Sequence, residues 1–449
     1  AALAEAARTQ RVQRFMLGLF DGGDEAAGPA DSLRVVTLVD RGVQEARLLD
    51  RDPLIQAELY NTLGGVSQQL GNLATADTLL RAALEKRQAL LGPDNADVAE
   101  SQVALGLLRV DQAEYEEGER LIRSGLATAD RLPPTHPVRA AATAALGRVL
   151  EERGEYAEAI PVLEEAVRLQ TAPGPPTTEL VESLSELANT HFYAGHLALS
   201  DSLNHRILAM DRQLHGDRHP RVGDDLINLG AIQFEQGHYG DAERYYRDAL
   251  AIIEPFFGPD HPNTASNLTM LARSLVFQQR YDEATELLRR SLAIQERTYG
   301  PVHPAVASAV NELGTVALQR EQYDEAERYF QRMVDIYREV YRDHHYLISI
   351  ALSNLASVYL ARGEPARAES LYREALHRYE STLPPTHINV GVTRIKLGRA
   401  LLRQHRYGEA TVELQAGYDI VEKQATPSVS WLQAARKDLA EARAAGTGR

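Results

Sequence analysis

The chain has 449 residues, of which 44% are hydrophobic and 25% charged, with no cysteine and a formal net charge of −15. The lack of cysteine excludes disulfides, thiolate zinc sites and a cysteine nucleophile. The acidic balance argues against a nucleic-acid-binding protein, which needs a basic surface. No apolar run approaches the roughly 18 residues that span a membrane.

Residues 1–56 are expected to form an N-terminal helical segment with a Gly/Pro linker. The stretch RVQRFMLGLF predicts a helix with one apolar face, made of Val12, Phe15, Met16, Leu19 and Phe20. The stretch DGGDEAAGPAD is typical of a linker, and residues 33–49 predict a second helix. We expect the apolar face to dock on the rest of the chain, on a second copy or on a membrane surface.

Residues 57–427 repeat nine times with a period of 41 or 42 residues. Each repeat carries a Leu followed by a small residue: Gly64, Gly106, Gly147, Ala188, Gly230, Ala272, Gly314, Ala356 and Gly398. A second small residue follows twelve positions later in every repeat. Within residues 322–341 the apolar positions recur at three and four, which predicts a helix. Each repeat is therefore expected to be two helices, A and B, that cross closely at the small residues.

The stretch NELGTVALQREQYDEAERYFQRMV resembles the tetratricopeptide repeat (TPR), and its 42-residue period is similar to that of kinesin light chain. The resemblance implies an all-α fold, a right-handed superhelical solenoid of TPR helical hairpins. It also implies that the A helices line a concave groove. Residues 428–449 predict a C-terminal capping helix in which Trp431 covers the exposed core of the last repeat.

The stretch ARTQRVQRFMLGLFDGGDEAAGPADSLRVVTLVDRG is similar to the region that follows the transmembrane helix in bacterial membrane-anchored Ser/Thr protein kinases. The resemblance implies a regulatory or sensing region, on the extracytoplasmic side of a bacterial membrane in preference to the cytoplasm. Any link to a membrane is expected only through an anchor upstream of this chain. The sequence contains no kinase motif, so no catalytic residue carries over.

Six histidines recur at one point of the repeat: His136, His219, His261, His303, His345 and His387. Zinc needs three or four ligands around one centre, and equivalent positions of stacked repeats are about 8–10 Å apart. Gly-Pro can end one helix and His-Pro can begin the next, so we interpret the motif as helix punctuation. Gly258 and Gly300 are expected to adopt left-handed C-cap conformations.

No phosphate-binding loop or nucleophile elbow occurs, and acidic clusters are interleaved with basic residues as on a solvated helix. We therefore predict a chain that is not an enzyme, with no catalytic residue, cofactor or metal ligand. Binding of a protein or peptide in the groove is the expected function, because stacked repeats create an extended concave surface.

The TPR resemblance implies which side chains face the groove and bind the partner. These are Asn61, Asn189, Tyr193, Asn228, Phe234, Arg273, Phe277, Asn311, Asn354, Arg399 and Arg403. An Asn amide both donates and accepts hydrogen bonds, so it suits an extended peptide backbone. The alternative is that these polar side chains are simply solvated.

Charge is distributed unevenly along the chain. Residues 51–180 contain 12 Lys/Arg and 20 Asp/Glu, whereas residues 391–449 contain 10 and 6. Arg399 and Arg403 are expected to bind an acidic partner or the acidic end of another copy. The sequence thus leaves two hypotheses: a protein- or peptide-binding scaffold or sensor of a bacterial signalling protein, and a self-assembling protein that forms homo-oligomers or filaments end to end.

Overall fold

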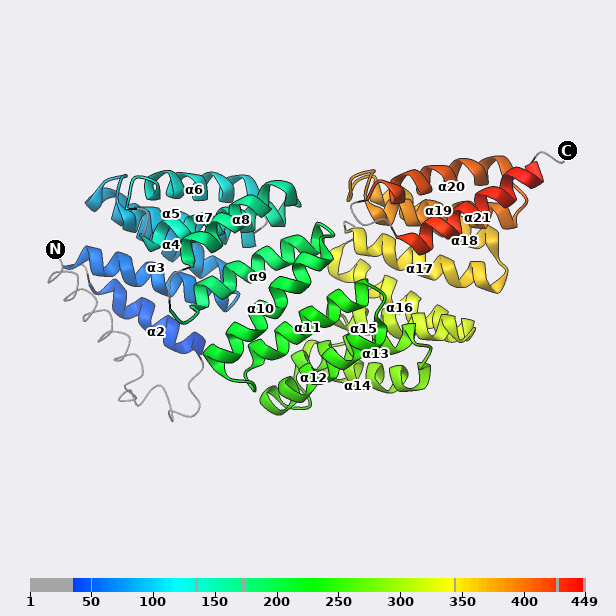
Figure 1. Ribbon diagram of the computed structural model, residues 1–449, viewed down its shortest axis with the longest axis horizontal. Helices are drawn as coiled ribbons and strands as arrows, with labels where there is room; N and C mark the ends of the chain where they lie inside the picture. The colour runs from blue at the N-terminus through cyan, green and yellow to red at the C-terminus, as the bar shows by residue number, and fades with distance from the viewer. Residues whose placement is uncertain are drawn as a thin grey trace. The chain divides into compact units, whose positions relative to one another are not determined.

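The computed structural model describes residues 35–49, 51–112, 114–133, 136–171, 174–342, 345–424 and 428–446. The predicted apolar helix at 11–20 and its linker lie outside these residues. The described residues form α-helices and contain no strand, which confirms the predicted all-α class (Figure 1).

The chain divides into two compact units, residues 1–193 and 194–449. The first unit contains α2 (Val35–Arg47), α3 (Pro53–Gln69), α4 (Leu73–Leu91), α5 (Ala96–Asp111), α6 (Tyr115–Ala129), α7 (Pro137–Glu152), α8 (Tyr156–Gln170) and α9 (Thr178–Tyr193). The repeat pattern continues evenly through the division, so the sequence gives no sign of it.

The second unit begins with the B helix of the fourth repeat. It contains α10 (Leu197–His215), α11 (Pro220–Glu235), α12 (Tyr239–Phe257), α13 (Pro262–Phe277), α14 (Tyr281–Tyr299), α15 (Pro304–Gln319), α16 (Tyr323–Tyr341), α17 (Tyr346–Arg362), α18 (Pro365–Tyr379), α19 (Ile388–Arg403), α20 (Tyr407–Glu422) and α21 (Val429–Gly446).

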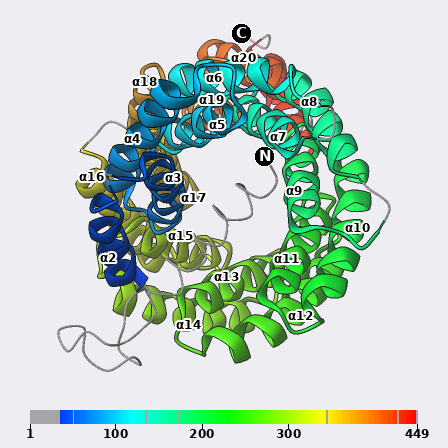
Figure 2. The same cartoon turned by 90° about the vertical axis from the view of Figure 1, so that its left-hand side faces the viewer.

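Odd-numbered helices from α3 to α19 are the predicted A helices, and the helix after each is its B helix. Within each unit, A helices pack on their own B helices, and each B helix packs on the next A helix. Figure 2 shows the A helices on the inner side of each unit and the B helices on the outer side, as for α11 and α13 beside α12 and α14. The A helices thus supply the inner surface of each unit.

The small residue of each A helix permits a close crossing with its B helix. A Cβ added to Gly314 would lie 2.8 Å from the Phe330 ring, and one added to Gly230 would lie 2.7 Å from the Tyr246 ring. Cβ atoms do not approach other atoms this closely, so a larger residue at either position would force the neighbouring ring to move. The predicted close crossing is confirmed at both positions.

Each histidine of the repeated motif is the N-cap of an A helix. The Nδ1 atoms of His261 and His303 accept hydrogen bonds of 3.1 Å from the backbone N–H of Asn263 and Ala305. The other four histidines cap their helices in the same way. The interpretation as punctuation is confirmed, and the imidazole takes the role usually filled by Ser, Thr, Asp or Asn.

Gly258 and Gly300 end their B helices with positive φ, as predicted, but the expected left-handed helical conformation is wrong. Their φ/ψ angles are 100°/159° and 80°/171°. This extended region at positive φ is accessible essentially only to Gly. The chain therefore straightens at once into the Pro-containing turn that leads to the next N-cap.

The C-terminal helix α21 packs on α20 and α19. It buries Ala435, Leu439 and Ala442 in the core cluster of the last repeats, and Trp431 is partly buried against the same cluster. On the described residues, α21 thus covers apolar side chains of the last hairpin.

Candidate functional site

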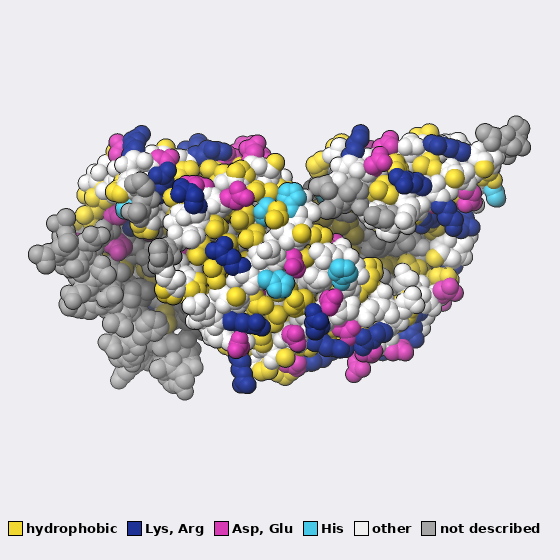
Figure 3. Space-filling model, in the orientation of Figure 1, with side chains coloured by type: hydrophobic (Ala, Val, Ile, Leu, Met, Phe, Trp, Pro, Cys, Tyr) yellow, Lys and Arg dark blue, Asp and Glu magenta, His cyan; other side chains and the backbone are white. Residues whose placement is uncertain are grey.

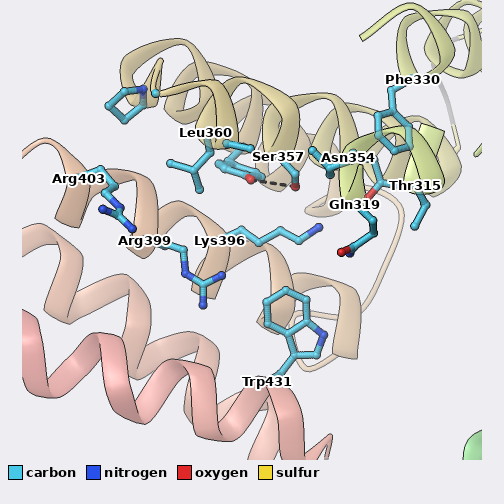
Figure 4. A pocket seen from close by; sticks show the side chains of 15 residues that line it. Thr315, Gln319, Phe330, Asn354, Ser357, Leu360, Lys396, Arg399, Arg403 and Trp431 are labelled. Atoms are coloured by element: carbon cyan, nitrogen blue, oxygen red, sulfur yellow. Dashed lines mark hydrogen bonds between the residues drawn. The ribbon is translucent and has the colours of Figure 1, made fainter. Parts of the chain in front are cut away.

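A hollow of about 850 Å³ lies on the A-helix side of the last three repeats in the second unit (Figure 4). Its lining comes from α15, α17 and α19, with contributions from two B helices and from Trp431 of α21. The described lining residues include Lys396, Arg399 and Arg403 but no Asp or Glu. In a chain with a net charge of −15, such a lining is unusual and favours an anionic or strongly polar ligand.

Lys396 extends across the middle of this hollow, with its ammonium on the side of Asn354 and Gln319 (Figure 4). Its Nζ donates a hydrogen bond of 3.4 Å to Ser353 Oγ and lies 5.7 Å from the centre of the Trp431 ring. Burial, together with the charge of Arg399, lowers the pKa of Lys396 to about 8. A negative charge in the hollow would therefore stabilise the protonated form of this amine.

The two predicted arginines differ in their surroundings. Arg399 Nε donates a 2.8 Å hydrogen bond to Asp438 Oδ2, and Asp438 is buried on α21. Arg403, one turn further along α19, is exposed and lines the hollow. Arg399 thus holds the C-terminal helix, whereas the side chain of Arg403 is exposed at the hollow.

The predicted asparagines of the last repeats connect neighbouring A helices. Asn354 Nδ2 donates a 2.8 Å hydrogen bond to Asn311 Oδ1, and Asn311 Nδ2 donates to Glu312 Oε1 at 3.3 Å. Burial raises the pKa of the Glu312 carboxyl, although Arg273 opposes the shift. These amides form a polar ladder between repeats, and Asn354 also lines the hollow.

The predicted aromatic residues of repeats five and six form a cluster with one exposed member. Phe234 is 8% exposed and belongs to the core, whereas Phe277 is 51% exposed and contacts it edge to face at 5.0 Å. The Arg273 guanidinium lies 4.5 Å from the centre of the Phe234 ring. Asn228, on the same A helix as Phe234, is partly exposed.

The remaining predicted residues lie in the first unit. Asn61 Oδ1 accepts from Ser101 Oγ at 2.9 Å, so it links α3 to α5. Asn189 is partly exposed, and Tyr193 is 59% exposed and stacks on Tyr156 at 6.1 Å. The eleven predicted residues are therefore spread over the repeats, and Asn354, Arg399 and Arg403 are those that line the hollow.

Lys396 was missed as a groove residue, although the sequence contained a signal for it. Lys396 stands two positions before Gly398, as Asn228 and Asn354 stand two positions before Gly230 and Ala356. Glu312 occupies the same position in repeat seven. This position therefore changes from acid to amide to amine along the last three repeats.

A family model described as tetratricopeptide repeat matches the chain over overlapping stretches, at residues 55–129, 97–172, 179–254, 239–297, 271–339, 305–381 and 347–423. The chain belongs to the tetratricopeptide repeat family. Proteins with this repeat and fold are typically non-catalytic scaffolds for protein interaction. No curated protein matches the TPR chain.

Solved structures share the TPR fold at low sequence identity. The apo quorum sensor NprR from B. thuringiensis is 13% identical, with 80% of this chain and 97% of that one covered and a TM-score of 0.57. The Pyrococcus horikoshii signal transduction ATPase with numerous domains, which has a TPR sensor, is 14% identical, with 86% and 56% covered and a TM-score of 0.53. A putative kinesin light chain of Podospora anserina is 24% identical, with 46% and 98% covered and a TM-score of 0.41.

No described helix is both long enough and apolar enough to cross the bilayer. No three His, Asp or Glu side chains of the described ranges are grouped so that they could hold a metal ion.

Proposed function

We propose that this TPR chain is a non-catalytic scaffold or sensor region of a bacterial signalling protein, and that it binds a peptide segment of a protein partner. The groove surface of the last three repeats is the proposed binding site. Two of the structurally similar proteins are named as sensors, which is compatible with this role.

The observation that carries the proposal is the hollow beside Lys396. It is large enough for several side chains, and its walls combine amides, cations and the apolar surfaces of Leu360 and Trp431. Pockets that bind ligands combine apolar walls with a few placed polar groups in this way. Asn354 can offer the second hydrogen of its amide to a peptide carbonyl while it remains bonded to Asn311.

Phage display of random 12-residue peptides on the purified chain tests the proposal. Selected peptides should bind about tenfold more weakly to Asn354→Ala and to Arg403→Ala, since each change removes a hydrogen-bonding group from the site. Arg328→Ala is the matched control, because Arg328 is exposed on the B helix α16. If no peptide is selected, or if Arg328→Ala weakens binding as much as the groove variants, the proposed site is wrong.

The second candidate function is self-assembly into homo-oligomers or filaments. The acidic N-terminal repeats and the exposed Arg403 near the basic end favour a head-to-tail contact. Arg399 is less suited to this contact, because Asp438 already neutralises it. Light scattering should then reveal assemblies that Arg403→Glu reduces in size, whereas a monodisperse monomer at every concentration would contradict self-assembly.

A further inference from the structure

A pair of stacked rings occurs at four successive repeat junctions of the second unit. The last residue of a B helix supplies the first ring, and the N-cap histidine of the next A helix supplies the second. The pairs are His215–His219, Phe257–His261, Tyr299–His303 and Tyr341–His345, with ring centres 4.0–4.6 Å apart and planes within 24° of parallel. We call these four pairs the ring ladder.

Helix capping does not require the first ring of each pair. His136 and His387 cap α7 and α19 with the same hydrogen bond, yet Leu132 and Leu383 stand four residues before them. An aliphatic side chain is thus sufficient at this position of the repeat. The rings of the second unit therefore provide something that the cap does not need, a row of aromatic surfaces at equivalent positions of consecutive repeats.

The ring ladder is accessible to a partner, since each of its eight rings keeps part of its surface exposed. Phe256 is 60% exposed and contacts both His219 and Phe257, so it joins the first two pairs. Val302 and Val340 are exposed beside the other two pairs in the sequence. Figure 3 shows basic, acidic and hydrophobic side chains intermixed over the face that it presents, whereas the ladder is aromatic at all four junctions.

Each N-cap histidine of the ring ladder has one hydrogen-bond donor to spare. Its Nδ1 accepts a hydrogen bond from the backbone N–H two residues later, so the proton of the neutral imidazole is on Nε2. Among the described residues, none accepts a hydrogen bond from the Nε2 of these four histidines, and these nitrogens are not buried. Each ring pair thus presents an aromatic face together with an N–H donor.

We propose that the ring ladder binds a proline-rich segment of a partner protein, held in the polyproline II conformation and lying across the repeats. The ladder is formed where B helices end and A helices begin, whereas the proposed groove site is on the inner faces of the A helices. It is therefore a second binding surface, beyond the proposed groove function. The spacing, the aromatic faces and the donors of the ladder together define this partner.

The spacing of the ring ladder matches a polyproline II helix. Equivalent positions of stacked repeats are about 8–10 Å apart. A polyproline II helix has three residues per turn and rises about 3.1 Å per residue, so it advances about 9 Å per turn. A β-strand presents the same face about every 7 Å, and an α-helix advances only about 5.4 Å per turn. One proline in every three can therefore face successive ring pairs, and about 10–12 residues span all four.

The chemistry of the ring ladder is also complementary to proline. Pyrrolidine rings pack on aromatic faces, which is how aromatic-lined grooves recognise polyproline II segments. Proline has no backbone N–H, so a proline-rich segment offers carbonyl acceptors and no donors. These carbonyls are not bonded within a polyproline II helix, and the histidine Nε2–H groups are the donors that they require. The conformation is also formed before binding, which keeps the entropic cost of binding small.

Fluorescence anisotropy with labelled oligoproline peptides tests this inference. Peptides of three, six, nine and twelve prolines should bind with increasing affinity, since each additional turn reaches another ring pair, and the gain should level off in longer peptides. A flexible Gly-Ser peptide of twelve residues should bind at least about tenfold more weakly than dodecaproline. Absence of saturable dodecaproline binding, or equal binding of the Gly-Ser peptide, would overturn the proposal.

Two double variants test the rings themselves. Phe257→Leu with Tyr299→Leu introduces the residue that stands at the equivalent positions before His136 and His387. His261→Asn with His303→Asn introduces the residue that caps α5, where Asn95 accepts the same backbone hydrogen bond. Both variants should therefore keep a nearly unchanged Tm, and each should weaken dodecaproline binding by about tenfold.

Tyr245→Leu is the matched control, because Tyr245 is a partly exposed aromatic residue in the middle of the B helix α12. Its dodecaproline affinity should equal that of the unmodified protein. Unchanged binding in both double variants, or an equal loss in Tyr245→Leu, would contradict the ring ladder.

The ring ladder and the proposed groove site can fail separately. Asn354→Ala and Arg403→Ala should leave dodecaproline binding unchanged. If they weaken it as much as the ring variants do, oligoproline binds in the groove and the ring ladder is wrong, while the proposed groove function stands. If light scattering shows instead that Phe257→Leu with Tyr299→Leu dissociates an oligomer, a second copy of the chain covers the rings and the proposal is likewise overturned.

Discussion

Replacing Asp225 with Asn should stabilise the second unit near neutral pH. Asp225 on α11 and Asp211 on α10 are 5% and 2% exposed, and their carboxyl groups lie close enough to interact. Burial, followed by the charge of Asp211, raises the pKa of Asp225 to about 8. Asn can donate an N–H to Asp211 without binding a proton.

The magnitude follows from the change in pKa. An Asp in the unfolded chain has a pKa near 3.9, so the raised pKa makes its contribution to stability greatest below that value. That contribution is lost progressively as the pH rises toward 8. At pH 7, about three pH units above the unfolded pKa, the lost contribution corresponds to roughly 4 kcal/mol. We expect Asp225→Asn to recover about 1–3 kcal/mol, since an amide donates a weaker hydrogen bond to Asp211 than a carboxyl does.

Thermal unfolding between pH 5 and pH 8, with hydrogen exchange to locate the effect, measures this prediction. The variant should have the higher Tm at pH 7–8, slower exchange in α10 and α11, and a smaller decline in stability with pH than the unmodified protein. Asp217→Asn is the matched control, because Asp217 lies in the turn between the same helices with an 83% exposed side chain. A lower Tm for Asp225→Asn at pH 7, or parallel pH profiles, would refute the reasoning.

Two further outcomes test the repeat itself. Gly314→Val should lower the free energy of unfolding by about 1–3 kcal/mol, because the added Cβ meets the Phe330 ring. Gly408→Val is the control and should lower it less, since a Cβ at Gly408 has no neighbour within 4 Å. Equal losses of Tm in the two variants would contradict the close crossing. Burial lowers the pKa of His345 and His387, so their capping contribution is full above about pH 6.5 and declines as the pH falls through the lower folded pKa. The double variant with Asn at both positions should therefore lose less Tm than the unmodified protein between pH 7.5 and pH 5, and an equal loss would exclude this role.

The repeat could be predicted from local rules. Small residues recur at a constant interval because helices A and B of every repeat cross closely at the same point, where a large side chain does not fit. The histidine motif was predictable for the same reason, although its N-cap hydrogen bond was not. The sequence pattern places His before Pro, but the orientation of the imidazole depends on the backbone of the turn.

The groove could be predicted only in part. Position within the repeat indicated that Asn354, Arg399 and Arg403 face the inner surface, and all three line the hollow. Their roles depend on neighbours that are distant in sequence. Arg399 donates a hydrogen bond to Asp438, which lies 39 residues later in the sequence. Asn354 donates one to Asn311, which lies 43 residues earlier.

The sequence by itself determined the period, the all-α class and the positions at which helices begin, end and cross. These features follow from contacts that recur in each repeat, so nine copies of the pattern reinforce one another. Only the tertiary structure decided the partners of individual charges. It places the buried carboxyl of Asp225 beside Asp211, and it leaves the amine of Lys396 without a carboxylate among the residues that line its hollow. Burial and pairing depend on the side chains that neighbouring helices bring together, and a repeat pattern does not specify these.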